Sequence, residues 1–88
     1  MLTEKEALEA ALEFTAKNGA RRLYPLRTSP VKSSFGSDFT GKKILGCEHD
    51  FWSFIFEVDV PPDVVVSPGI AIVLVDPENG KVDYFPAL

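Results

Sequence analysis

Cys47 and His49 are the residues of this sequence whose types and spacing come closest to catalytic chemistry. On an extended segment, side chains two residues apart point to the same side, so a thiolate could face an imidazole. Nucleophilic catalysis also needs an orienting group, donors for the developing oxyanion and a pocket. The chain has one cysteine and one histidine, so neither type can enlarge the site. We therefore interpret Cys47 as a small apolar residue, His49 as a surface residue beside a strand, and the protein as not an enzyme.

The same stretch places four metal-ligand types in a row, Cys47-Glu48-His49-Asp50. Four adjacent residues cannot all converge on one ion, and structural zinc sites usually recruit ligands from two separated segments. Because the sequence shows no second cluster, we expect no metal. Residues 76–80 lack the alternating acids and the distant glutamate of a calcium loop, so they predict a hairpin turn instead.

A glycine-containing stretch, Gly36 to Lys42, fits the phosphate-loop pattern GxxxxGK. Lys43 stands where a serine or threonine should hold magnesium, and a phosphate loop joins a buried strand to a helix. The flanking residues read as polar loop and short strand. We expect neither a nucleotide nor any other cofactor.

The acidic pair Glu57 and Asp59 lies on one side of an extended segment, about 7 Å apart. Such pairs occur in glycosidases, and they are equally typical of a solvated strand face. An acidic face beside aromatic residues suits a basic protein surface, because charge steers the encounter and aromatic side chains anchor it. The residues that we predict to bind a partner are Glu57, Asp59, Trp52, Tyr84 and Asp83.

The first element that must position these residues is a helix over residues 4–18. Thr3 and Glu6 form a capping box, in which each side chain accepts the other residue's amide. Apolar or small residues recur at helical spacing on one face, namely Leu8, Ala11, Leu12 and Thr15. Asn18-Gly19 then ends the helix, since glycine adopts the left-handed conformation without steric cost.

The remaining elements are strands. Alternation of Trp52, Phe54 and Phe56 with polar residues predicts a strand over residues 51–60 whose aromatic face packs against the helix. A hairpin follows, with strands at 70–75 and 81–85. We also expect short strands at 20–26 and 43–47, and a flexible surface loop at 28–41. The sum is an α+β domain, one N-terminal helix packed on an antiparallel sheet of about four to five strands, in a cystatin-like arrangement.

Length and charge exclude several classes of protein. Eighty-eight residues make one domain, residues 1–88, with a single core. The net charge is −4, and the stretch from Glu48 onward contains eight acidic residues but a single basic one, Lys81. Because this acidic half would repel phosphate groups, we expect no nucleic-acid partner. The longest apolar stretch, residues 70–75, is far too short to cross a bilayer, so we expect no membrane partner. No secretory signal opens the chain and its one cysteine fits a reducing compartment, which predicts a cytoplasmic protein.

The order of helix, W-x-F-x-F strand at 52–56 and strand-turn-strand hairpin at 73–82 resembles small bacterial immunity-type domains of the YrhB-like group. The resemblance implies a non-enzymatic protein that binds and blocks a toxin, for which a basic toxin domain is the expected partner. Two alternatives stay open. One is a small-ligand-binding or enzymatic domain with a pocket between helix and sheet, and the other is a homodimer that pairs edge strands.

Overall fold

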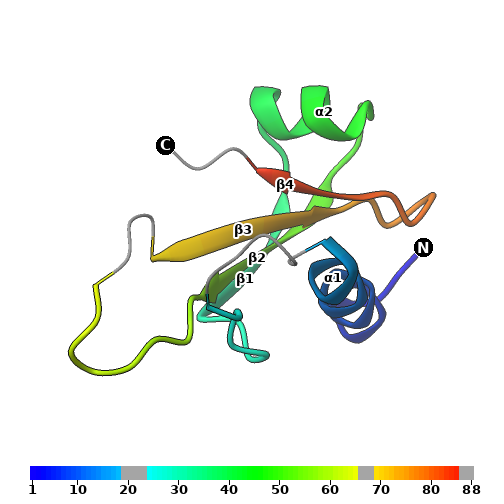
Figure 1. Ribbon diagram of the computed structural model, residues 1–88. Helices are drawn as coiled ribbons and strands as arrows, with labels where there is room; N and C mark the ends of the chain where they lie inside the picture. The colour runs from blue at the N-terminus through cyan, green and yellow to red at the C-terminus, as the bar shows by residue number, and fades with distance from the viewer. Residues whose placement is uncertain (19–23, 66–68, 86–88) are drawn as a thin grey trace.

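The computed structural model describes residues 1–18, 24–65 and 69–85 (Figure 1). The predicted α+β fold is confirmed: an N-terminal helix accompanies a four-stranded antiparallel sheet in the order β1-β2-β3-β4. The elements are α1 (Glu4–Asn18), β1 (Lys32–Gly36), α2 (Phe39–Leu45), β2 (Phe51–Glu57), β3 (Ile70–Val75) and β4 (Val82–Phe85). No helix in the described part of the chain is long and apolar enough to span a membrane.

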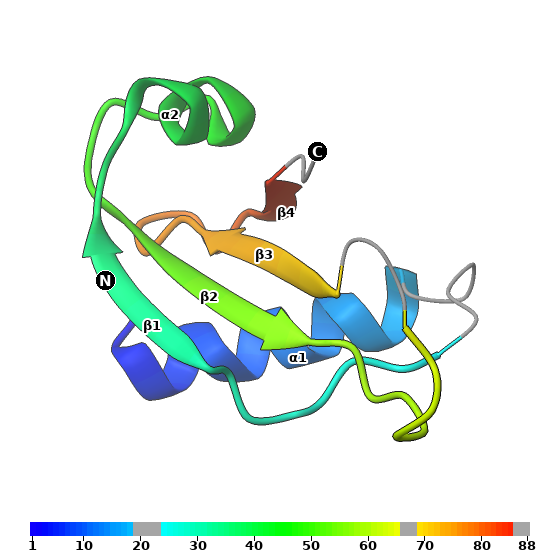
Figure 2. The same cartoon turned by 90° about the vertical axis from the view of Figure 1, so that its left-hand side faces the viewer.

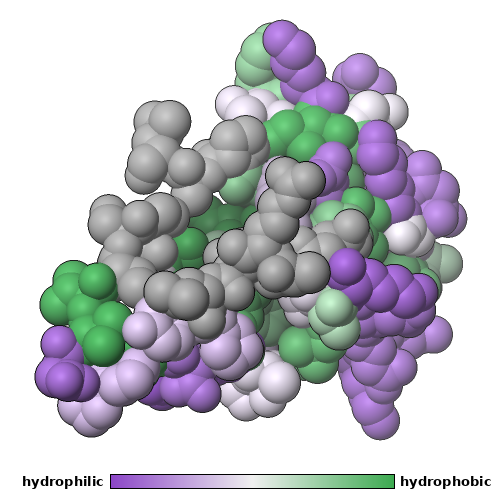
Figure 3. All heavy atoms as spheres, viewed as in Figure 1, coloured by the Kyte–Doolittle hydropathy of each residue, from purple (hydrophilic) through white to green (hydrophobic). Residues whose placement is uncertain are grey.

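Helix α1 begins where its capping box predicts. The Thr3 amide donates to Glu6 Oε1 at 3.0 Å, and the Glu6 amide donates to Thr3 Oγ1 at 3.2 Å. The backbone hydrogen bond from Thr3 and its side chain together hold the pKa of Glu6 below the usual value. Polar side chains cover the outer side of α1, as the purple surface in Figure 3 shows where α1 lies in Figure 1.

The main core lies between α1 and the sheet. Six side chains with no exposed surface fill it: Ala7, Ala11, Phe54, Phe56, Val73 and Val75. The two alanines let the helix approach the aromatic side chains of β2 closely. The predicted packing of the helix stripe on the aromatic strand is therefore confirmed, and Ala7 joins it one turn before Ala11.

A second core occupies the opposite face of the sheet, beneath α2 (Figures 1 and 2). Asp38 caps this helix, because its Oδ1 accepts the Gly41 amide at 2.6 Å. Gly46 ends it in the left-handed conformation at φ 68°, where glycine is favoured. Leu45 of α2 packs there on Phe51 and other buried residues, so β2 is covered on both faces at its first residues.

Two predictions for the middle of the chain are wrong. Residues 28–41 are not a loop throughout, because β1 pairs with β2 in the register Ser34↔Ser53 and α2 begins at Phe39. Residues 43–47 are not a strand, because α2 continues to Leu45. The buried positions Gly41 and Leu45 are four residues apart, which is helical spacing. Backbone pairing with a neighbour makes β1 a strand despite its weakly β-forming sequence.

The predicted strand at 20–26 falls partly on residues 19–23, outside the described ranges. Its described end is not a strand, and only Leu26 forms an isolated bridge, to Val58. Backbone hydrogen bonds flank this bridge: Arg27 donates to Glu57 O, and Asp59 donates to Pro25 O, both at 2.8 Å. The segment before β1 therefore lies beside the end of β2, which itself stops at Glu57 rather than Val60.

Candidate functional site

The five residues predicted to bind a partner lie on two faces of the sheet. Trp52 and Tyr84 face α1 and are half-buried at the margin of the main core. The Trp52 indole donates to Leu2 O at 3.2 Å, and its ring packs against Phe35 with centroids 4.7 Å apart. Tyr84 packs against Phe14 at 5.0 Å. Both side chains thus serve the helix–sheet contact.

The three acidic residues of that set lie away from the two aromatic ones. Asp83 points to the face opposite α1 and accepts the Tyr84 amide at 2.8 Å. Glu57 is exposed at the last position of β2. Asp59 follows it, also exposed, 3.9 Å from the Arg27 guanidinium. The sequence grouped these residues by type, whereas strand alternation separates them.

An exposed apolar surface that the prediction did not include borders β1. Val31 and Phe35 are 54% and 42% exposed, respectively. We call these two side chains with the outer side of β1 the β1 edge. Among the described residues, β1 pairs with β2 alone, so its other side carries backbone groups with no strand beside them.

The structure also gathers Cys47, His49 and Asp76 into one cluster. The register Trp52↔Val75 places the start of β2 next to the end of β3. Cys47 and His49 come just before β2, and Asp76 comes directly after β3, so pairing of the two strands brings them together. One ligand atom from each residue lies within 4.8 Å of the others. The sequence argument against a metal site assumed that no second segment supplies a ligand. Asp76 lies in such a second segment and brings a carboxylate to the cluster.

Asp76 is the fixed centre of this cluster. Its side chain is fully buried, and its Oδ1 accepts hydrogen bonds from His49 Nε2 at 2.7 Å and from the Glu78 amide at 2.8 Å. Burial acts to raise the pKa of the Asp76 carboxyl, but the hydrogen bonds from His49 and from the Glu78 amide, together with the nearby Asn79 amide, outweigh it, so this pKa is lowered. The other oxygen, Oδ2, is buried with no hydrogen-bond partner among the described residues.

Cys47 and His49 are held differently. Cys47 is buried, its amide donates to Lys42 O at 3.1 Å, and its thiol donates to the backbone oxygen of His49 at 3.5 Å. The thiol therefore bonds to the backbone of His49 rather than to its ring, which does not match a nucleophile paired with a base. The His49 side chain is 41% exposed and reaches Asp76 from the solvent side.

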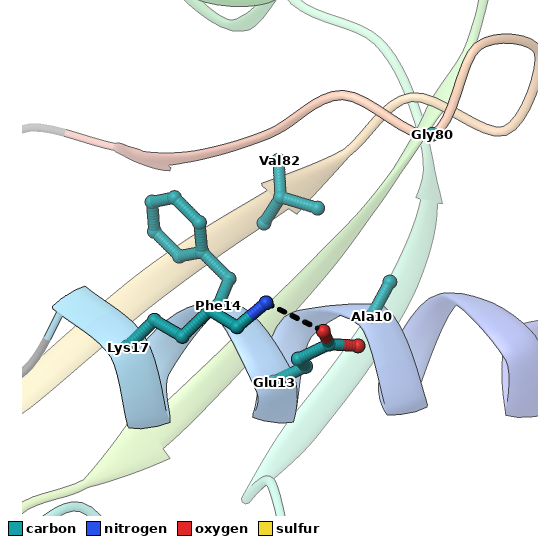
Figure 4. A pocket seen from close by; sticks show the side chains of 6 residues that line it. All are labelled: Ala10, Glu13, Phe14, Lys17, Gly80 and Val82. Atoms are coloured by element: carbon teal, nitrogen blue, oxygen red, sulfur yellow. Dashed lines mark hydrogen bonds and ion pairs between the residues drawn. The ribbon is translucent and has the colours of Figure 1, made fainter.

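Two surface hollows adjoin these elements. One of about 370 Å³ is lined by Cys47, Glu48, Phe39, Gly46, Lys42 and Lys43. The other, of about 300 Å³, lies between α1 and the residues leading into β4 (Figure 4) and is lined by Ala10, Glu13, Phe14, Lys17, Gly80 and Val82. The Glu13–Lys17 ion pair, at 2.8 Å, lies along its rim. An exposed ion pair and apolar side chains offer this second hollow no evident chemistry.

The fold and these sites find no counterpart by comparison. Neither protein-family models, nor curated proteins, nor solved structures give a match to this chain.

Proposed function

We propose that this protein is a non-catalytic binding module that takes an extended segment of a basic protein partner along the β1 edge. The observation that carries the proposal is the position of two exposed apolar side chains, Val31 and Phe35, on and next to an outermost strand. An exposed strand edge can accept another strand through main-chain hydrogen bonds, while neighbouring side chains supply specificity.

Phe35 is the natural anchor of this surface. Its ring rests on Trp52 with centroids 4.7 Å apart, so its orientation is largely fixed before binding. It still exposes 42% of its surface, which a partner can bury. Aromatic residues held in place in this way lose little conformational entropy when they bind, and they commonly dominate interface energies.

Charge favours a basic partner over a second copy of this chain. The protein carries a net charge of −4, and a second copy would carry the same charge. Glu57 and Asp59 are exposed where β2 ends, and the segment leading into β1 runs beside them. They would steer a positively charged segment toward this part of the sheet. The YrhB-like resemblance implies the same proposal in a narrower form, with a toxin domain as the partner in a bacterial cytoplasm.

An enzymatic or small-ligand function has less support. That alternative requires a pocket between helix and sheet, and six fully buried side chains fill the centre of this interface. The hollow beside α1 is lined by an exposed ion pair and apolar groups. The β1 edge is the stronger basis for a function.

The test is co-purification of a partner from source cells, followed by calorimetric titration with variants of the β1 edge. We expect Val31→Ser and Phe35→Ser each to weaken binding at least about fivefold, since truncating an interface anchor typically costs more than about 1 kcal/mol. Val65→Ser is the matched control, because Val65 is 94% exposed and lies outside this edge. Binding should also weaken as salt is raised.

Two results would reject the proposal. One is equal affinity of the partner for the wild-type chain and both edge variants. The other is a stable homodimer in light scattering that Val31→Ser converts to monomer, which would assign the edge to a second copy instead.

A further inference from the structure

We propose that Cys47, His49 and Asp76 together bind one transition-metal ion of the zinc class. The three side chains come from two segments that are far apart in the sequence, and one donor atom from each lies within 4.8 Å of the others. This site is separate from the β1 edge and does not depend on it.

The donor set selects the metal. A thiolate, an imidazole and a carboxylate are the three side-chain donors that zinc uses in proteins. Calcium and magnesium prefer oxygen ligands alone, so a set that contains sulfur and nitrogen disfavours them. Three protein ligands leave a fourth tetrahedral position for water or an external ligand.

The distances are compatible with one ion after a small adjustment. Zinc–ligand bonds of about 2.0–2.3 Å place tetrahedral ligand atoms roughly 3.3–3.8 Å apart. The His49 Nε2 to Asp76 Oδ1 distance of 2.7 Å is shorter than that, so His49 must give up this hydrogen bond and its ring must move away from Oδ1 when both side chains bind one ion. The exposed ring of His49 can move, whereas Asp76 is fixed by the turn that follows β3.

The orphan oxygen of Asp76 is the second observation that points to a ligand. Oδ2 is fully buried and has no hydrogen-bond partner among the described residues. A buried carboxylate oxygen without a partner is costly, and coordination of a cation would remove that cost. Oδ1 could meanwhile keep its hydrogen bond from the Glu78 amide, which would orient the carboxylate as outer-shell partners do.

Solvent can reach the cluster. Cys47 lines the hollow of about 370 Å³ beside α2, and His49 is partly exposed. An ion therefore has an access route, and the hollow has room for a fourth ligand. Lys42 and Lys43 line the same hollow, and their charge would favour an anionic fourth ligand over a neutral one.

The first test is titration of the tag-free, metal-free protein with Zn²⁺ in competition with a chromophoric chelator. We expect one ion per chain. His49→Gln and Cys47→Ser should each weaken binding by at least about 100-fold, because even outer-shell partners typically contribute about 10–100-fold to metal affinity. Asp50→Asn is the matched control: it removes an exposed acid that directly follows His49 in sequence but lies outside the cluster and outside the hollow. It should bind zinc as the wild type does.

Two further readouts separate a lost ligand from a damaged fold. Co²⁺ in place of zinc should give thiolate-to-metal charge-transfer absorption, which Cys47→Ser abolishes. Zinc should raise the melting temperature of the wild type and of Asp50→Asn, and leave that of His49→Gln unchanged. Circular dichroism confirms that each variant is folded.

The proposal is overturned if the wild type binds no stoichiometric zinc or cobalt at neutral pH. It is also overturned if His49→Gln and Cys47→Ser retain the wild-type affinity, or if the cobalt complex lacks thiolate absorption.

Discussion

Replacing Asp76 by asparagine tests whether a buried carboxylate holds the β3–β4 turn and the start of β2 together. The substitution keeps the shape of the side chain and an oxygen that can accept the Glu78 amide. It removes the charge that receives the His49 hydrogen bond at 2.7 Å. It also places an NH₂ group in a fully buried position where one carboxylate oxygen already has no partner among the described residues.

We expect Asp76→Asn to lower the free energy of unfolding at neutral pH by about 2–4 kcal/mol. A hydrogen bond to a charged acceptor typically contributes about 1.5–3 kcal/mol, and an NH₂ group buried without an acceptor adds a cost of about 1 kcal/mol, while the Glu78 contact is retained. A domain of 88 residues has a total stability of about 4–13 kcal/mol, so the loss is large. Asp83→Asn is the control: Asp83 accepts one local amide, and its replacement should cost about 1 kcal/mol or less.

The difference between wild type and Asp76→Asn should depend on pH in a defined direction. The pKa of Asp76 is lowered by folding, so its contribution is complete above its usual value of 3.8 and is lost as the pH falls through the folded-state pKa. The stability gap should therefore narrow below about pH 4. His49→Gln removes the largest of the interactions that lower this pKa, so that variant should unfold at a higher pH than the wild type on acidification.

The assay is urea unfolding followed by circular dichroism between neutral and acidic pH, with a chelator present to remove metal ions. Unchanged m-values would show that the compactness of the unfolded state is the same. The reasoning fails if Asp76→Asn costs no more than Asp83→Asn at neutral pH, or if the gap stays constant throughout the acidic range.

Four further substitutions, one of them a control, test the packing of the two cores and the cap of α1. Gly41→Ala should destabilise by about 1–2 kcal/mol, because a Cβ there overlaps the buried Phe51 ring, while the helix preference of alanine offsets about 1 kcal/mol of that cost. Gly36→Ala, with open space at its Cβ, should be neutral or slightly stabilising in the same chemical denaturation experiment. Thr3→Ala should lower the free energy of unfolding by about 1 kcal/mol, which corresponds to a melting temperature lower by about 4–8 °C. Equal melting temperatures of the variant and the wild type would argue against the capping box. Phe54→Ala should cost about 3–5 kcal/mol in urea unfolding, and a loss below 2 kcal/mol would contradict its central place in the core.

The sequence by itself determined the elements whose signals are local. A capping box at Thr3 begins α1, because the bonds that it makes join residues three apart. The alternation at 52–56 predicted both the strand and its buried aromatic face. The turn residues at 76–80, which include Asn79-Gly80, predicted the β3–β4 hairpin. Such signals depend on neighbouring residues, so they can be read before any long-range contact is known.

Elements that depend on distant partners were beyond the sequence. Residues 32–36 have little intrinsic preference for a strand and become one by pairing with β2. Helix α2 is only seven residues long, and its two buried positions do not suffice for a periodic signal.

The candidate metal site shows the same division. The sequence brought Cys47 and His49 together because they are two residues apart, and without a third ligand it gave no reason to expect a site. Asp76 is 27 residues beyond His49, and only the register of β2 against β3 brings the two within 2.7 Å. A strand register is set by packing over the whole sheet, so it is the tertiary structure that turns an isolated pair of residues into a cluster of three.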